Sequence, residues 1–204
     1  MIDGTGKGAP GTGQRERQRG DGPRRQREIF DAALSLLAEN GYERLTIEAV
    51  AERATVNKTT IYRWWPSKAA LLGAALMGTP TLRFDVPDTG SLRGDLEALV
   101  EAILALLTKP PAADIAVAAL AAAAHSPELA ATARTFFADR LARENPVFER
   151  AAARGELPPD TDPTLLVDLL AGAVWVRVVL RQTPVGEDFA RRTVSFVLDG
   201  VRPG

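Results

Sequence analysis

Cysteine is absent from this sequence, and histidine occurs once among its 204 residues. The missing cysteines exclude disulfides, thiolate nucleophiles and cysteine-ligated zinc. No glycine-rich phosphate loop and no cluster of His, Asp and Glu at metal-ligand spacing occurs. Acid–base, nucleophilic and metal-dependent catalysis therefore all lack an evident set of residues. We expect a protein that is not an enzyme and that needs no cofactor and no metal.

Long uncharged apolar runs are missing as well. No such stretch reaches the roughly 18 residues that suggest a membrane span, and residues 1–23 contain no apolar segment typical of a secretory signal. The apolar share of 46% and the charged share of 25% are those of an ordinary globular protein. We therefore expect a soluble, cytoplasmic protein.

Charge is nearly balanced overall but unevenly distributed along the chain. The formal net charge is −1, yet residues 1–78 hold 12 basic and 9 acidic residues, whereas residues 79–204 hold 13 and 17. The N-terminal part therefore suits a polyanion, although a merely solvated face would give similar counts. Residues 1–23 have little to bury and are expected to be a disordered tail. The tail is either a solvated leader or an arm that reaches DNA through Arg15, Arg17, Arg19, Arg24 and Arg25.

The hydrophobic periodicity predicts an all-α protein. A helix begins near Arg24 and stops at Asn40-Gly41, and Thr46, Asn57 and Ser67 are good N-caps for three further short helices. Residues 79–90, with Pro and Gly near both ends, are predicted to be a linker. Ala- and Leu-rich helical segments follow at about 91–108, 112–125, 127–145, 146–155, 163–182 and 186–200. The sequence thus predicts a tail (1–23), a helical N-terminal domain (24–78) and a helical bundle (79–204).

Residues 46–64 have the form of a helix-turn-helix, whose second helix lies in the major groove of DNA. At about 100° per residue, Ile61 and Trp65 share one side of that helix, while Thr59 and Arg63 lie opposite. The first side should be buried, and the second carries hydrogen-bond donors. We expect phosphate contacts from Thr46, Thr60, Tyr62 and Lys68, and base contacts from Lys58, Thr59 and Arg63.

Each of these residues could be ordinary when taken alone. Asn57 and Ser67 can be explained as N-caps, and Lys68 as a surface lysine. Trp64 lies at the border of the buried side, where it could cover the core or contact a phosphate. The spacing of the whole set favours DNA binding over these separate explanations.

The run GYERLTIEAVAERATVNKTTIYRWWPSKAALL resembles the DNA-binding domain of the TetR family of transcriptional regulators. It has the family's Gly-aromatic pair, capping Thr, Ala-x-x-Ala-x-Val, Thr-x-Tyr and Ser-Lys-x-x-Leu. Thr55 replaces the usual Gly and Asn57 the usual Ser, which leaves the operator sequence open. The resemblance implies a three-helix DNA-binding domain and a C-terminal bundle that binds a small molecule and dimerises. It further implies a ligand-responsive repressor that binds a pseudo-palindromic operator as a homodimer.

The segment 163–182 is apolar on nearly all sides. Between Leu165 and Leu180 only Asp168 and Arg177 are charged, and we expect this stretch to be too short and too polar to span a bilayer. A second copy of the chain could cover it together with the 186–200 helix, although the centre of a monomeric bundle is the alternative. The predicted dimer interface consists of Leu169, Gly172, Val176, Leu180, Phe189, Val194 and Val197.

Bulky apolar residues of the C-terminal part could enclose a largely apolar effector, although such residues more often form a core. The candidates are Phe136, Phe137, Leu141, Phe148 and Trp175. Trp175 could equally belong to the dimer interface. His125 is interpreted as a partner of a helix C-terminal dipole. The remaining alternative is a non-specific DNA-binding protein, which would show a strong salt dependence and little sequence preference.

Overall fold

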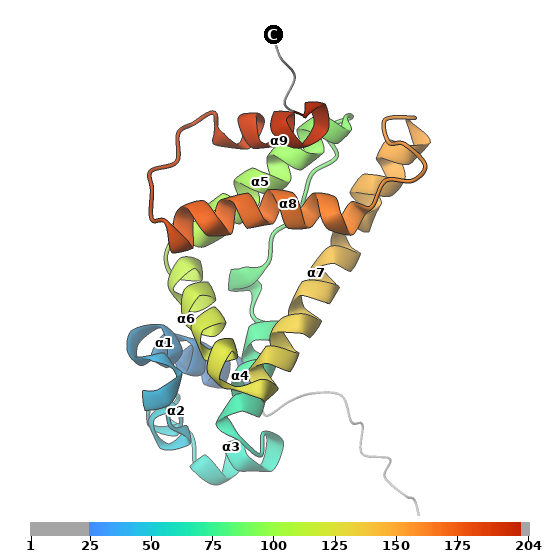
Figure 1. The fold of residues 1–204 in the computed structure, drawn as a ribbon. Helices are drawn as coiled ribbons and strands as arrows, with labels where there is room; N and C mark the ends of the chain where they lie inside the picture. The colour runs from blue at the N-terminus through green and yellow to red at the C-terminus, as the bar shows by residue number, and fades with distance from the viewer. Residues whose placement is uncertain (1–24, 201–204) are drawn as a thin grey trace, which may run out of the picture.

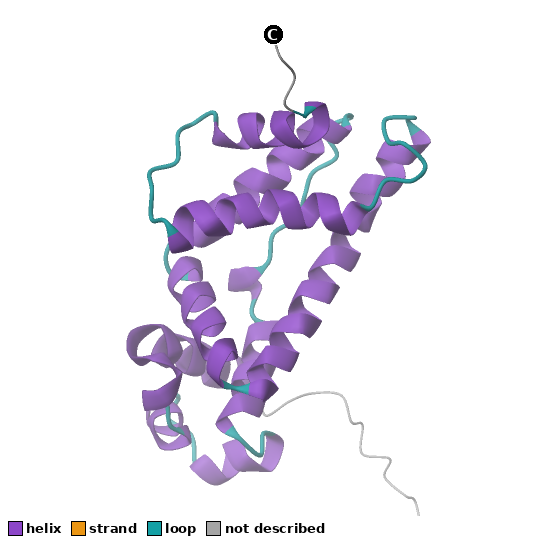
Figure 2. Ribbon diagram, viewed as in Figure 1, coloured by secondary structure: helices purple, strands orange, loops and turns teal. Residues whose placement is uncertain are grey.

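The structure is a computed structural model that describes residues 25–200. These residues form nine α-helices, one 3-10 turn and one π-helical turn, with no strand among them (Figure 2). The predicted tail and its Arg15, Arg17, Arg19 and Arg24 lie outside the described residues. The elements are α1 (Gln26–Arg44), α2 (Ile47–Arg53), α3 (Lys58–Trp64), α4 (Lys68–Gly78), η1 (Pro80–Leu82), α5 (Leu92–Thr108), α6 (Ala112–His125), α7 (Pro127–Ala153), α8 (Pro163–Trp175), η2 (Val176–Leu180) and α9 (Phe189–Asp199).

Helices α1 to α4 gather at one end of the molecule, drawn blue to teal at the bottom of Figure 1. Their fully buried side chains include Ile29, Leu37, Ile61 and Leu71. The same core continues without a break into α6 and α7, and its residues there are Ile115, Ala122 and Leu129. The N-terminal helices therefore rest on α6 and α7 and share a core with them.

Helices α5 to α9 form the other end of the molecule. In Figure 1, α6 and α7 run from the N-terminal helices up to α8, which crosses above them, and α9 lies beyond α8. A second core cluster joins α5, α7, α8 and α9 through residues that include Leu96, Phe148, Leu170, Val174 and Val194. The segment between α4 and α5 runs between α6 and α7.

Of two predicted helix ends, the structure confirms one and contradicts the other. The predicted stop at Asn40-Gly41 is confirmed by the backbone, because Gly41 is non-helical (φ 73°, ψ 171°) and interrupts α1 before its last turn. The predicted break at Pro146 is wrong, because α7 runs unbroken from Pro127 to Ala153. Pro146 removes the hydrogen bond to the carbonyl of Ala142, but both residues are exposed, so water can hydrate the freed carbonyl.

The segment Pro163–Leu180 is more apolar and longer than the sequence interpretation allowed. Helix α8 and η2 are continuous over 18 residues with a mean hydropathy of 1.8, so by length and composition alone the segment could cross a membrane. The expectation that it is too short and too polar is therefore wrong. It packs against α5 and α9, and two of its 18 residues, Leu170 and Val174, are buried. Its exposed large apolar side chains are Leu165, Leu169, Val176 and Leu180.

Candidate DNA-binding surface and effector cavity

The three short helices of the candidate DNA-binding surface begin at the predicted caps. The hydroxyl of Thr46 accepts a hydrogen bond from the amide of Ala49 at 3.1 Å, and that of Ser67 accepts one from Ala70 at 2.9 Å. Asn57 Oδ1 accepts both the amide of Thr59 at 3.0 Å and its hydroxyl at 2.9 Å. The Thr59 hydroxyl is thus engaged in the cap, and its methyl group is the part predicted to contact a base.

The two faces of α3 divide as the sequence predicts. Ile61 is completely buried, and Trp65 is 9% exposed, with its ring centroid 5.3 Å from that of Phe30. Trp64 is 47% exposed, and Tyr62 is similarly open. Lys58, Thr59 and Arg63 are exposed and Thr60 is half-buried. Trp65 therefore fixes α3 to α1 through the core, while the opposite face of α3 remains available to a partner.

Lys58 lies beside an acidic residue of α2. Its Nζ is 3.4 Å from Glu48 Oε1, and both side chains are more than half exposed. The pKa of Glu48 is lowered mainly by a hydrogen bond with its own backbone, and to a smaller extent by the hydrogen bond with Lys58. Exposed pairs of this kind contribute little to stability, so Lys58 can leave Glu48 for a nucleic acid at small cost.

Lys68 occupies a place that the sequence did not reveal. Its Nζ donates to the carbonyl of Tyr42 at 2.9 Å and to that of Leu45 at 3.4 Å, and it lies 4.2 Å from the centroid of the Tyr42 ring. An ammonium at this position satisfies carbonyls at the C-terminal end of α1 and interacts favourably with its dipole. Of its three donors, one is left for the phosphate contact that the sequence predicted.

The turn between α2 and α3 places Thr55 in the left-handed region, at φ 53°. The amide of Val56 donates to Ala51 at 2.9 Å and that of Thr55 to Glu52 at 3.0 Å, and Arg25 Nη1 donates to the Thr55 carbonyl at 2.8 Å. Arg25, which the sequence placed in a possible DNA arm, therefore braces this turn. A β-branched residue is strained at positive φ.

We expect Thr55→Gly to raise the free energy of unfolding by about 1 kcal/mol, because glycine adopts this conformation without steric cost. Thermal or urea unfolding measures the effect. Thr55→Ala is the matched control, since alanine keeps the penalty of the left-handed region and should gain much less. A glycine variant no more stable than the alanine variant would contradict the strain at this turn.

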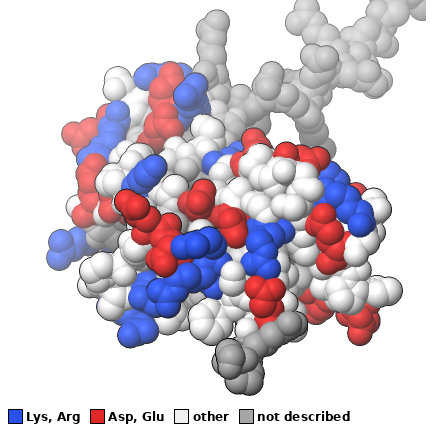
Figure 3. Space-filling view, turned by 90° about the horizontal axis from the view of Figure 1, so that it is seen from above, with Lys and Arg blue, Asp and Glu red and all other residues white. Residues whose placement is uncertain are grey.

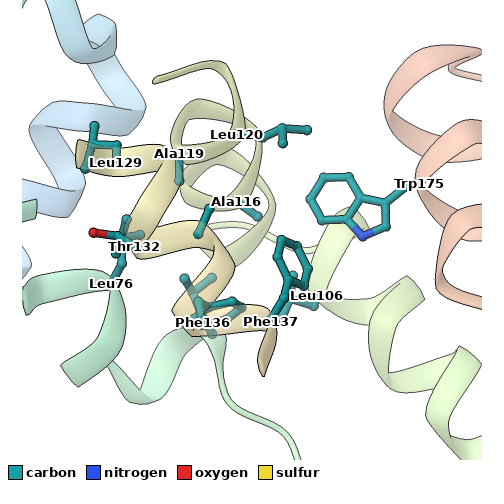
Figure 4. Close-up of a pocket in the computed structure, with 12 residues that line it drawn as sticks. Leu76, Leu106, Ala116, Ala119, Leu120, Leu129, Thr132, Phe136, Phe137 and Trp175 are labelled. Carbon is teal, nitrogen blue, oxygen red and sulfur yellow. The ribbon is translucent and has the colours of Figure 1, made fainter. Parts of the chain in front are cut away.

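A cavity lies between the N-terminal helices and the bundle, with a free volume of about 80 Å³. Figure 4 shows Trp175 on one side of the cavity and the other labelled side chains, which include Phe136, Phe137 and Leu106, across from it. The two phenyl rings lie nearly perpendicular, with centroids 5.8 Å apart. Leu76 of α4 and Leu82 of η1 complete the wall toward the N-terminal helices. The polar groups among the lining side chains are the Thr132 hydroxyl and the indole nitrogen of Trp175, and the Thr132 hydroxyl donates to the Glu128 carbonyl at 3.2 Å.

Three of the five residues predicted for an effector site line this cavity, namely Phe136, Phe137 and Trp175. Leu141 and Phe148 do not line it, and Phe148 is buried in the second core cluster. Both lie farther along α7, where that helix leaves the cavity and packs on α5 and α8. The walls contributed by α4, η1, α5 and α6 were missed, because periodicity on one helix does not show which other elements face it.

A stripe of exposed apolar side chains runs along α8 and η2. Leu169 is 51% exposed and Leu180 is 73% exposed, and Leu165 and Val176 lie on the same stripe. A side chain added at Gly172 would meet no atom within 4 Å, so this position is open. Phe196 extends the apolar surface onto α9. Leu165 was not among the residues predicted for the interface.

Three predicted interface residues on α9 face inward. Phe189 and Val197 pack against the second core cluster, and Val194 has no exposed surface, so it offers nothing to a partner, contrary to its predicted place. The reason is that α9 packs against α5 and α8 and covers the second core cluster with these side chains. Figure 3, which looks onto this end of the molecule, shows acidic and basic side chains interspersed. The end of the molecule at α9 therefore lacks the surface of positive charge alone that binding of a polyanion would require.

Comparisons with known proteins place both halves of the chain in the same family. Residues 29–75 match the family described as bacterial regulatory proteins, tetR family, and residues 86–197 match the tetracyclin repressor-like C-terminal domain. The chain belongs to the TetR family of transcriptional regulators. As a member of this family, it is a soluble cytoplasmic DNA-binding protein and not an enzyme.

Individual relatives of this TetR-family regulator match over most of their length. An uncharacterised HTH-type transcriptional regulator of Bacillus subtilis, YdeS, is 33% identical over 85% of this chain and 88% of its own. The DNA-binding transcriptional repressor TetR of Mycobacteroides abscessus is 33% identical over 90% of this chain and 97% of its own. The crystal structure of the TetR family regulator SCO0332 matches with 36% identity and a TM-score of 0.69, over 89% of this chain and all of that one.

The linker of this TetR-family regulator is held by a buried ion pair. Arg140 on α7 donates to the Phe84 carbonyl at 3.1 Å, its guanidinium lies 3.4 Å from the Phe84 ring centroid, and its Nε is 3.4 Å from Glu144 Oε1. Burial raises the pKa of Glu144, and the nearby Arg140 opposes that effect. The path from α4 to α5 is thus fixed against α7.

A second polar cluster ties α5 to α7. Asp95 has no exposed surface, and its Oδ1 accepts the amide and the hydroxyl of Thr89, each at 2.7 Å. Arg150 of α7 and Arg154, the C-cap of α7, lie 3.6 and 3.7 Å from Asp95 Oδ2. Burial would raise the pKa of Asp95, but the Thr89 hydrogen bonds and the two arginines lower it below its usual value. Within residues 25–200, no group of His, Asp and Glu is arranged to hold a metal ion.

Proposed function

We propose that this TetR-family regulator is a repressor that binds a pseudo-palindromic operator as a homodimer and is released by a small, largely apolar molecule. The observation that carries the proposal is the position of the cavity. Its wall includes Leu76 of α4, the helix that directly follows the recognition helix α3. A molecule in the cavity would therefore contact α4, and a duplex would contact α3, which directly precedes α4 in the chain.

The exposed face of α3 supports the DNA contacts. Thr46, Thr60, Tyr62 and the remaining donor of Lys68 would hold phosphates, which set the position of the protein on the duplex. Lys58, Thr59 and Arg63 would reach base edges, and Trp64 would border the backbone. Two such helices in a two-fold dimer would enter successive major grooves about 34–36 Å apart.

The apolar stripe on α8 and η2 supports the homodimer. Leu165, Leu169, Val176 and Leu180 lie on one side of a helix that its own subunit covers poorly. A two-fold axis would lay the same stripe of a second copy against it. The repressor named among the relatives supports the direction of regulation.

The apolar lining of the cavity supports an apolar effector. The small volume of the cavity implies that its walls must move apart when the effector binds. Its volume of about 80 Å³ is smaller than that of a typical ligand pocket, which is roughly 300–1,000 Å³. A bound molecule would push the walls apart, and α4 is one of them. The effector would lower operator affinity by favouring the arrangement with a wider cavity.

Selection of bound sequences from a random duplex pool tests the proposed function. The full chain should enrich a palindrome whose half-sites are separated by about one helical turn. Equal retention of all sequences, with a steep dependence on salt, would instead identify a non-specific DNA-binding protein.

Tyr62→Phe is expected to weaken operator binding by at least about 10-fold, because one hydrogen bond from the hydroxyl to a charged phosphate is lost. The loss should be the same for the selected operator and for operators with single base changes, since phosphate contacts read no sequence. Fluorescence anisotropy with labelled duplexes measures both. A changed order of preference among the duplexes would refute a phosphate role for Tyr62.

A further inference from the structure

Helix α4 meets α7 along a contact that begins beside the recognition helix. The hydroxyl of Ser67, the N-cap of α4, donates to the carboxylate of Glu128, whose two oxygens each lie 3.3 Å away. Glu128 is in the first turn of α7. The start of α4 is thereby tied to the start of α7, two residues after Trp65 ends the recognition helix.

The two helices also lie close together farther along, at Gly73 and Thr132. Gly73 is buried in the middle of α4, and a Cβ placed on it would lie 2.8 Å from Thr132 Oγ1 and 3.4 Å from Thr132 Cγ2. A separation of 2.8 Å is shorter than any normal contact of a Cβ atom. Only glycine therefore permits α4 to lie this close to α7.

Thr132 has little freedom to give way. It is β-branched, so two heavy atoms face Gly73, and within a helix its χ1 angle is limited to two rotamers. Its hydroxyl also donates to the carbonyl of Glu128 at 3.2 Å, which holds the side chain in place. Because alanine is a better helix former than glycine, the helix itself gives no reason for a glycine at position 73. The close approach of Gly73 to Thr132 gives that reason.

The same contact borders the effector cavity. Thr132 lines the cavity together with Leu129 and Phe136 on α7, and Leu76 lines it from α4, one turn beyond Gly73. In Figure 4, Thr132 and Leu76 lie together at the edge of the cavity farthest from Trp175. Any widening of the cavity at this edge must separate α4 from α7 at Gly73.

We infer that the Gly73–Thr132 contact is a positioning contact that holds α4, and through it the recognition helix, in the DNA-binding arrangement. The inference rests on the proposed function as an operator-binding dimer. A methyl group at Gly73 separates α4 from α7 without an effector and so imitates the bound state. It changes the relation between the two recognition helices of a dimer and leaves each helix-turn-helix intact.

The test measures the affinity of Gly73→Ala for the selected operator and for a duplex that contains one half-site. Operator affinity should fall at least about tenfold, a typical size for coupling between sites, while half-site affinity stays within about twofold. Sedimentation and circular dichroism establish that the variant is a folded dimer. A folded dimeric variant with the operator affinity of the wild type overturns the inference.

Two second-site changes separate crowding from other effects of the substitution. Thr132→Ala removes both crowding atoms and should restore the operator affinity of Gly73→Ala to within about threefold. Thr132→Val keeps the shape of threonine and should not restore it. If Gly73→Ala does not fold, the Gly73→Ala/Thr132→Ala variant decides: a folded, operator-binding double variant supports the contact, and an unfolded one overturns it. A wild-type protein that selects no operator would refute the proposed function itself, before any variant is compared.

Discussion

Replacing Leu169 and Leu180 together with aspartate is expected to turn the regulator into a monomer whose operator affinity is at least about 100-fold lower. Both leucines are more than half exposed on the apolar stripe of α8 and η2. Burying two carboxylates there without partners costs several kcal/mol. A monomer engages a single half-site and loses the gain from binding two linked sites.

Sedimentation velocity and operator titration measure the two consequences separately. Val117→Asp is the matched control, because Val117 is also an exposed aliphatic residue but lies on α6, away from the stripe. This control should sediment as a dimer and bind the operator normally. A Leu169→Asp/Leu180→Asp variant that still sediments as a dimer would refute the proposed interface.

Asp95→Ala is expected to lower the free energy of unfolding by about 3 kcal/mol, the lower end of the range for breaking a buried ion pair. The lower end of this range applies because Arg150 and Arg154 also lie near Asp88, whose carboxylate remains as their partner after the substitution. The substitution removes both Thr89 hydrogen bonds and the charge that faces the two arginines. Urea unfolding at neutral pH measures the loss.

The same carboxylate predicts a pH dependence. The pKa of Asp95 in the folded protein is lower than in the unfolded chain, so its stabilisation is fully present above the unfolded pKa, about 3.9. It is lost as the pH falls through that value toward the folded pKa. The stability difference between the wild type and Asp95→Asn should therefore be constant above about pH 5 and shrink in more acidic solution. A difference that grows on acidification would contradict the lowered pKa.

The helix-turn-helix was largely predictable because its signals are local. Thr46, Asn57 and Ser67 cap helices at the predicted positions, and helical geometry alone separated Trp65 in the core from Trp64 at the surface. Local signals were less reliable when tertiary packing opposed them. Pro146 was expected to end a helix, but α7 is continuous there and buries Val147 and Phe148, which follow the proline.

The candidate cavity and the buried polar groups depended on contacts that are distant in the sequence. Leu76, Leu106 and Leu120 come from three different helices, and no spacing on one helix relates them. Lys68 appears in the sequence as a surface cation, yet the carbonyls that it satisfies lie 26 and 23 positions earlier. Asp95 appears as an ordinary acidic residue in the first turn of a helix until the arginines of α7 are placed beside it.

The continuous core beneath α1 and α4 limits how modular this regulator can be. Ile115, Ala122 and Leu129 belong to α6 and α7 but are buried with the residues of the DNA-binding helices. A chimera that exchanges only residues 25–78 for those of a relative would therefore have its new helices face the original surface of α6 and α7. Exchange of operator specificity between family members should succeed where these three positions are transplanted together with the DNA-binding helices.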